Sequence, residues 1–167
     1  MDKFCGARPI IDLSNFRGAD DKARLDAATR YCRAHPGCTL RVPPGTYTLR
    51  SAHATEVEDR VMRGRYGVNA QNVLFKPDFV FDRGLDLEGL RNTVIDGTGA
   101  RLMADGYWEV IAIRHADNVT VRGFTVDHLR RPYSRGTVEA VKDGWITVRL
   151  APEYPVFPET PFGLRQC

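Results

Sequence analysis

The chain has 167 residues, of which 43% are hydrophobic and 27% charged, and a formal net charge of +3 at pH 7. This length suits one hydrophobic core rather than two, and the composition is ordinary for a globular protein. No apolar run reaches the roughly 20 residues that span a bilayer, so we expect no membrane partner. The first residues lack the pattern of a signal peptide, which leaves the localisation unknown.

The first expected elements are a short strand with a turn over residues 9–19 and a helix over residues 20–34. Asp20 is a suitable N-cap because its side chain can accept from the first free backbone N–H groups. Leu25, Ala28 and Cys32 recur at helical spacing and predict one buried face. We expect this helix to cap one end of the structure that follows.

Residues 39–49 predict two short strands around the turn Pro43-Pro44-Gly45, because proline cannot take part in a strand ladder. Residues 51–83 are less regular, and we expect a solvated loop there. A polar site is the alternative for five residues of this segment, which are His53, Glu56, Glu58, Asp59 and Arg60.

A repeat of 26 residues is the strongest pattern in the chain, relating Asn92 to Asn118 and Gly97 to Gly123. Short alternating apolar runs between Asn and Gly are typical of a coiled parallel sheet, whose coils lie about 4.8 Å apart. We expect such coils over about residues 39–126. Their stacked pairs would be Thr93 with Val119 and Ile95 with Val121 inside, Val94 with Thr120 outside, Asp96 with Arg122, and Asn92 with Asn118.

A hairpin is expected over about residues 137–150, because Asp143-Gly144 separates two alternating apolar runs. The following residues 151–162 are too rich in proline for regular structure. We treat residues 1–167 as a single domain.

The basic residues are spread along the chain, and the one dense patch, Arg130 and Arg131 with Arg135, is short. This argues against a nucleic-acid partner. The four cysteines, Cys5, Cys32, Cys38 and Cys167, have no metal-binding spacing, and we expect neither a metal nor a cofactor. Cys32 and Cys38 flank a turn and could be bridged, or Cys32 could be a buried apolar residue of the helix.

Several of these segments together resemble the N-terminal part of right-handed parallel β-helix proteins of the pectate-lyase-like superfamily. The segments that carry the resemblance are the helix over 20–34, Val42-Pro-Pro-Gly-Thr-Tyr47, residues 92–100 and residues 118–127. The resemblance implies an all-β fold, a right-handed parallel β-helix with an N-terminal capping helix and a hairpin insertion.

Residues 124–138 and the hairpin are most similar to family 110 of the glycoside hydrolases, which are inverting exo-α-galactosidases that cleave terminal α-1,3-linked galactose. This resemblance implies a carbohydrate partner. Inverting hydrolysis needs two carboxyl groups about 6.5–9.5 Å apart. Because Asp127 alone occupies a suitable position here, we expect the catalytic residues beyond Cys167.

The candidate substrate-binding residues lie near the end of the repeat and in one aromatic pair. They are Asp127, His128, Arg131, Tyr133, Arg135 and Trp108, with Tyr107 beside Trp108 as a possible stacking partner. For Asp127 the alternative is a turn residue that bonds its own backbone. For Tyr107 and Trp108 the alternative is a pair of aromatic residues that cover the outside of the coil.

Two functions of different classes remain after the sequence analysis. The first is the N-terminal portion of a carbohydrate-active enzyme, an inverting galactosidase-like glycoside hydrolase. The second is a non-catalytic β-helix module that binds polysaccharide or supports assembly, as in tail spikes and surface proteins. In either case we expect that the open end of a short coil can self-associate.

Overall fold

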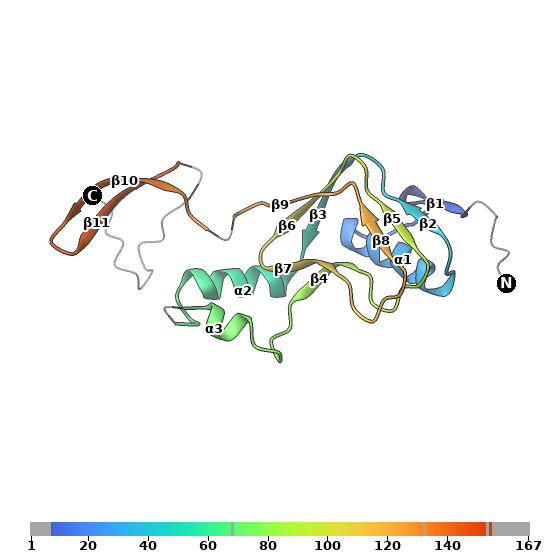
Figure 1. Cartoon of the computed structure of the whole chain (residues 1–167), viewed down its shortest axis with the longest axis horizontal. Coiled ribbons are helices and arrows are strands. Elements are labelled where there is room, and N and C mark those ends of the chain that lie inside the picture. Colours follow the sequence, from blue (N-terminus) through green and yellow to red (C-terminus); the bar gives the residue numbers. More distant parts are fainter. Residues whose placement is uncertain (1–7, 68, 132, 153, 155–167) are drawn as a thin grey trace.

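The computed structural model describes residues 8–67, 69–131, 133–152 and 154, and within these residues most regular structure is strand (Figure 1). No helix in this part of the chain is long and apolar enough to cross a membrane. Three sheets contain parallel strands only. The first holds β1 (Ile10–Asp12), β2 (Thr39–Arg41), β5 (Val94–Asp96) and β8 (Thr120–Arg122); the second holds β3 (Gly45–Arg50), β6 (Ala100–Asp105) and β9 (Thr125–His128); the third holds β4 (Asp82–Asp86) and β7 (Trp108–Ala112).

The chain visits the three sheets in a fixed order and returns to the first. One circuit is β2–β3–β4, the next is β5–β6–β7, and β8–β9 begins a third. Each strand pairs in parallel with its counterpart in the preceding circuit, so successive circuits lie on one another. We call β1 to β9 with their connections the parallel stack.

The register of the stack confirms the 26-residue repeat. Ile95 pairs with Val121 in the first sheet, and Leu85 pairs with Ile111 in the third. In the second sheet Leu102 pairs with Val126, an offset of 24, because two residues (123–124) separate Arg122 from Thr125, whereas four (97–100) separate their partners Asp96 and Arg101. The repeat predicted the parallel neighbours, and the shorter connection changes the spacing in one sheet only.

The Asn residues of the repeat form a corner of the stack, as expected. The amide Nδ2 of Asn118 donates to Oδ1 of Asn92 over 2.8 Å, and both residues have a φ of 51°. Asparagine tolerates this left-handed backbone better than most residues, which accounts for its position before each strand. On the outside, Arg122 Nη2 lies 2.7 Å from Asp96 Oδ2, as predicted.

The core lies inside the stack, where alternate side chains of the strands point inward. Thr93 and Ile95 are fully buried, while Val94 between them is half-buried and Thr120 above it is exposed. This alternation is the two-residue period that the sequence shows. The leucines that complete this core are Leu40, Leu49, Leu85, Leu87, Leu90 and Leu102.

Helix α1 (Asp21–Ala34) packs against the strands of the first circuit. Asp20 caps it by accepting from the backbone N–H of Ala23 over 2.7 Å. The predicted apolar face is buried, with no exposed surface at Leu25, Ala28 or Cys32. This face therefore belongs to the same core as the strands.

Two hydrogen bonds connect α1 to backbone groups of the first circuit. The backbone N–H of Thr48 on β3 donates to Asp21 Oδ2 over 3.0 Å, and Arg33 Nε donates to the carbonyl of Glu88 over 2.7 Å. In the first sheet the edge of β2 is covered by another strand, β1, which pairs with it in parallel. Backbone groups at a sheet edge need such partners, because an unpaired edge can pair with another chain.

Cys32 and Cys38 are both free and buried in this structure. Burial, and then the hydrogen bond and charge interaction with the neighbouring Cys38 thiol, raise the pKa of Cys32 to about 12. Cys32 is thus a buried residue of the helix, which was one of the two alternatives. Cys5 and Cys167 lie outside the described residues.

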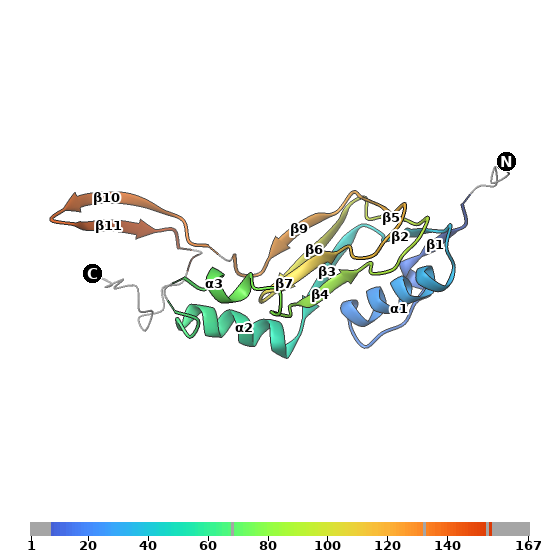
Figure 2. The same ribbon diagram turned by 60° about the horizontal axis from the view of Figure 1, so that its bottom comes forward.

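The prediction of a solvated loop over residues 51–83 was wrong. Two helices form there, α2 (Ala52–Met62) and α3 (Gln71–Leu74), and Figure 2 shows both beside the stack. Ser51 caps α2 by accepting from the backbone N–H of Ala54 over 2.9 Å, and Ala54 and Val57 are buried on one face. A capped helix with two apolar residues on one face is stable here because that face packs against the surface of the stack.

The polar residues of this segment do not converge on one site, which was the alternative prediction. Arg60 pairs with Glu56 over 2.5 Å, and Arg63 pairs with Asp59 over 2.8 Å, each one turn apart along α2. His53 lies 3.4 Å from Asp82 at the start of β4. The two pairs along α2 lie on its exposed side, where an ion pair contributes little to the stability of the fold.

The hairpin is formed by β10 (Gly136–Lys142) and β11 (Trp145–Leu150), which pair antiparallel. Its turn residues Asp143 and Gly144 have φ of 51° and 81°, the two positive values that a tight hairpin turn needs. The hairpin extends away from the stack in both ribbon views (Figures 1 and 2). The proline-rich segment 151–162 lies mostly outside the described residues.

Candidate functional site

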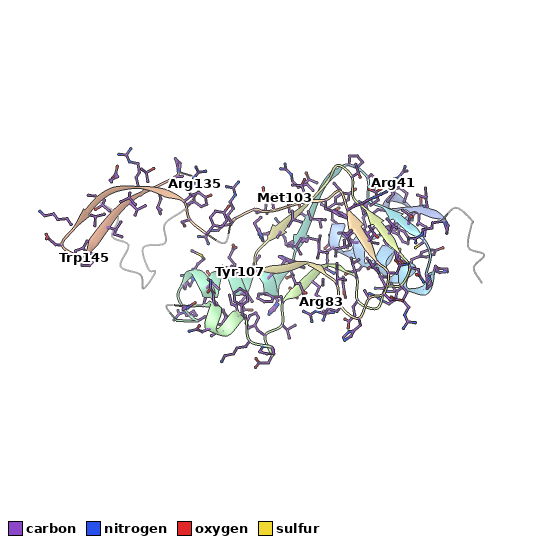
Figure 3. All side chains as sticks on the ribbon, in the orientation of Figure 1. Arg41, Arg83, Met103, Tyr107, Arg135 and Trp145 are labelled. Carbon is purple, nitrogen blue, oxygen red and sulfur yellow. The ribbon has the colours of Figure 1, made fainter. Side chains whose placement is uncertain are left out.

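A surface hollow of about 540 Å³ lies between the α2–α3 segment and the third sheet. This volume is within the range of small-molecule sites. The hollow is lined by aromatic, apolar and charged residues, which are Glu58, Leu74, Phe75, Lys76, Pro77, Phe79, Phe81, Gly106, Tyr107, Trp108, Glu109, Arg114, His128 and Arg130. The labelled Tyr107 lies where the two helices meet the stack (Figure 3).

The wall that α2 contributes is held at both the helix start and the β6–β7 turn. The Ser51 hydroxyl donates to the Asp82 carboxylate at the start of β4. At the turn, the backbone N–H of Tyr107 donates to the carbonyl of Ala54 over 3.0 Å. A Cβ on Gly106 would lie 2.5 Å from the backbone of Ala54, so only glycine permits this approach. These contacts place α2 directly against the β6–β7 turn.

Aromatic rings form much of the lining. Phe79 and Phe81 lie with ring centroids 4.8 Å apart, and Tyr66 meets Phe79 edge-on at 6.1 Å. The indole Nε1 of Trp108 donates to the carbonyl of Asp105 over 2.8 Å, which orients the ring. Phe75, by contrast, is 74% exposed and projects at the edge of the hollow. Phe79, Phe81 and Trp108 are therefore held by neighbours before any ligand arrives.

Glu58, Tyr107 and Arg130 all line the hollow and lie close enough for their charges to influence one another. Burial raises the pKa of Glu58, and the nearby Arg130 guanidinium opposes this shift. Burial, followed by the charge of Glu58, raises the pKa of the Tyr107 phenol. A carboxyl, a phenol and a guanidinium together can both accept and donate hydrogen bonds to a ligand.

A second carboxylate, Glu109, lies near two cations, one in the segment after β7 and one on strand β4. Arg114 Nη2 lies 2.6 Å from Glu109 Oε2, and Arg83 Nε lies 4.0 Å from the same oxygen. Within the described residues, no group of three or more His, Cys, Asp or Glu side chains could hold a metal ion. The paired charges and the aromatic rings of the lining can offer a ligand hydrogen bonds and ring contacts.

The structure brings only some of the predicted site residues together. Trp108 and His128 line the hollow, as does Tyr107. Asp127 and Arg131 lie beside it in a separate cluster at the end of β9, with 4.0 Å between Arg131 Nε and Asp127 Oδ1. Asp127 lies within strand β9 rather than in a turn, and its Oδ1 accepts from the backbone N–H of His128 over 2.9 Å.

The remaining candidates extend from this cluster towards the hairpin. Arg131 Nη1 donates to the Tyr154 hydroxyl over 3.1 Å, and the rings of Tyr133 and Tyr154 lie 6.1 Å apart. Arg135, labelled in Figure 3, is exposed just before β10. Its carbonyl accepts from the backbone N–H of Ala151. Of the six candidates, two line the hollow, three lie in or beside the strand-end cluster, and Arg135 lies apart from both at the start of the hairpin.

Sequence reasoning missed the half of the lining that comes from residues 52–81. Glu58 was grouped with polar residues of a loop, and Phe79 and Phe81 were not singled out. The available signals were the Ser51 cap with Ala54 and Val57 at helical spacing. The aromatic residues between 75 and 81 were a second signal, because a solvated loop seldom carries three phenylalanines.

The fold and the hollow together define a β-rich protein of stacked parallel strands with a surface site of aromatic and paired polar side chains. No family model matches the chain. It is similar to α-1,3-galactosidase B of Bacteroides thetaiotaomicron, with 30% identity over 127 residues, which are 72% of this chain and 19% of that protein.

Two further relatives bear names of the same kind. α-1,3-Galactosidase A of Shewanella woodyi is 28% identical over 135 residues, covering 80% of this chain and 20% of that protein. α-1,3-Galactosidase A of Bacteroides thetaiotaomicron is 27% identical over 123 residues, covering 72% and 20%. The chain therefore spans about a fifth of the length of the relatives it matches, and it is related to them at low identity.

Proposed function

We propose that the chain is the N-terminal portion of an inverting, galactosidase-like glycoside hydrolase that acts on terminal galactosides or a related polysaccharide. The observation that carries this proposal is the similarity, over most of the chain, to three proteins named α-1,3-galactosidases. All three are named as enzymes, which favours this function over a non-catalytic binding or assembly module.

The stack would form the first coils of a right-handed parallel β-helix. Two observations support this part of the proposal: the fixed order in which the chain visits the three sheets, and the parallel register between circuits. Ile113, Val126 and Leu129, near the ends of β7 and β9, are 45 to 55% exposed. Further coils stacked on these strands would bury such side chains.

The catalytic carboxylates of the proposed enzyme would lie beyond Cys167. In the strand-end cluster Asp127 already accepts from the backbone of His128 and lies near Arg131, so a contact to a sugar hydroxyl suits it better than proton transfer. The proposed substrate contacts remain Asp127, His128, Arg131, Tyr133, Arg135 and Trp108. The proposed partner is a carbohydrate, and the mechanism requires no cofactor.

The test compares the full-length product of the gene that contains this chain with the 167-residue chain itself. We expect the full-length protein to hydrolyse p-nitrophenyl α-galactoside, and proton NMR to show the β-anomer as the first product. The 167-residue chain should be inactive. Hydrolysis by this chain alone, lost in Asp127→Asn, would show that the active site lies within it. A full-length protein inactive on every α-galactoside would contradict the proposal.

A further inference from the structure

We propose that the hollow between the α2–α3 segment and the β6–β7 turn is a binding subsite for a neutral saccharide unit, with Glu58 as its central hydrogen-bonding group. The ligand class rests on the proposed function, and the subsite itself rests on the geometry of the hollow. None of the carbohydrate contacts proposed from the sequence includes Glu58 or the wall formed by residues 52–81.

The rings of the hollow suit one face of a pyranose. The axial C–H groups of such a ring form an apolar face, which packs favourably on the electron-rich face of an aromatic side chain. Tyr107 and Trp108 reach the hollow from the β6–β7 turn and β7, and the Phe79–Phe81 pair reaches it from the segment that follows α3. A flat ligand with C–H faces and a polar rim matches this arrangement better than a purely apolar ligand, because charged groups also line the hollow.

The charges of the hollow favour a neutral ligand over an anionic one. Glu109 is paired with Arg114, and Glu58 lies near Arg130, so each carboxylate already has a guanidinium close to it. The third cation of the lining, Lys76, is exposed, and solvent screens its charge. An anionic sugar would have to compete with these carboxylates for the same cations. A neutral hydroxyl can instead accept from a guanidinium and donate to a carboxylate in the same pair.

Glu58 is the group on which the subsite depends. It points from α2 into the hollow, whereas Glu56, two positions earlier, is exposed and pairs with Arg60 on the outside of the same helix. Burial strengthens hydrogen bonds, because the local dielectric is low. Glu58 therefore has the surroundings in which a bond to a sugar hydroxyl contributes most.

The site is also held in shape without a ligand. The close approach at Gly106 and the bonds at Ser51 and Tyr107 hold α2 against the stack. The indole hydrogen bond of Trp108 orients its ring. A preformed site loses less conformational entropy on binding, which allows even a single sugar unit to bind measurably.

The experiment uses the 167-residue chain and its two tryptophans, Trp108 in the hollow and Trp145 in the hairpin. Trp145→Phe leaves Trp108 as the single indole, so its fluorescence reports on the hollow. We expect a saturable change with methyl α-D-galactopyranoside and affinity at least fivefold weaker for galacturonate. Absence of a saturable change, or tighter binding of galacturonate, would overturn the proposal.

The matched variants are Glu58→Gln and Glu56→Gln in the same background. We expect Glu58→Gln to weaken binding at least fivefold and Glu56→Gln to change it less than twofold, with both melting temperatures unchanged. Equal affinities of the two variants would overturn the assignment of Glu58. This test measures binding only, so its outcome is distinct from that of the hydrolysis assay. If the full-length protein is active but the 167-residue chain does not bind the saccharide, the subsite alone is wrong. If the chain binds the saccharide but the full-length protein is inactive, the proposed function alone is wrong.

Discussion

The parallel stack and the β10–β11 hairpin are both made of paired strands, yet they bury their side chains very differently. Leu49, Ile95 and Leu102 of the stack have no exposed surface. In the hairpin, Val141 is 71% exposed and Trp145 is 72% exposed. Strand pairing satisfies backbone hydrogen bonds in both regions, but only the stack places sheets and a helix around one core. Pairing alone therefore does not stabilise a two-stranded hairpin in water.

The faces of the hairpin sharpen this contrast. Opposite residues of an antiparallel pair share a face, and Val138 with Val148 and Val141 with Ile146 make one face apolar. The other face carries polar pairs such as Thr137 with Arg149, and Glu139 forms an ion pair with Arg149. The hairpin thus has the alternation of a half-buried sheet, with the apolar half exposed among the described residues.

An aspartate substitution in each region should give the largest difference in stability between the stack and the hairpin. Leu25→Asp puts an unpaired charge under α1 in the fully buried core, at a cost of at least about 4 kcal/mol. Val141→Asp, on an exposed side chain, should change stability by less than about 0.5 kcal/mol. Circular dichroism melts and soluble yield measure both, and we expect Leu25→Asp to be unfolded or aggregated. A soluble Leu25→Asp protein with an unchanged melt would show that α1 packs elsewhere.

Two glycines with positive φ allow a finer comparison. Gly106→Ala must both accept a φ of 94° and displace the backbone of Ala54, so we expect about 2–4 kcal/mol of destabilisation. Gly144→Ala meets nothing within 4 Å and incurs only the strain of its φ of 81°, about 1 kcal/mol. Chemical denaturation measures both changes.

The same pair also tests the geometry of the hollow. Gly106→Ala should weaken saccharide binding because it moves α2 away from Tyr107, and Gly144→Ala should leave binding unchanged. If both variants melted alike and bound alike, the close approach of α2 to the β6–β7 turn would be wrong.

The smallest expected effect is a pH dependence at the outer surface of the stack. The Thr98 hydroxyl and then the Arg122 guanidinium lower the pKa of Asp96 to about 2. A lowered folded-state pKa adds stability above the unfolded value of about 3.9, and that stability is lost as pH falls towards 2. NMR titration of the carboxyl carbon should give a midpoint near 2.

Variants identify the cause of this shift. Thr98→Ala should raise the titration midpoint of Asp96 more than Arg122→Ala does, because the hydrogen bond from the Thr98 hydroxyl lowers the pKa of Asp96 the most. Arg149→Ala in the hairpin serves as the control and should leave the midpoint unchanged. A midpoint near 4 in the unsubstituted chain would contradict the ion pair between neighbouring circuits.

Much of the stack could be predicted because its signals are local and repeat. The alternation around Ile95 and Val121, the Asn residues at the corners and the cap of α1 each act over a few residues, so the sequence shows them directly. The hairpin was equally predictable from Asp143-Gly144. The α2–α3 segment was not predicted, although Ser51, Ala54 and Val57 carry a local signal for α2. Short helices depend for their stability on packing, and here the packing surface comes from strands elsewhere in the chain.

The sequence by itself determined the parallel neighbours within the 26-residue repeat and where α1 and the hairpin lie, since period, caps and turn residues act locally. Only the tertiary structure decided that α2 lies against the β6–β7 turn and that Glu58, Tyr107 and Arg130 come together. Glu58 and Arg130 are far apart in sequence, and no local pattern encodes their meeting. It depends on how the insertion packs against the completed circuits, and so the hollow exists only in the folded chain.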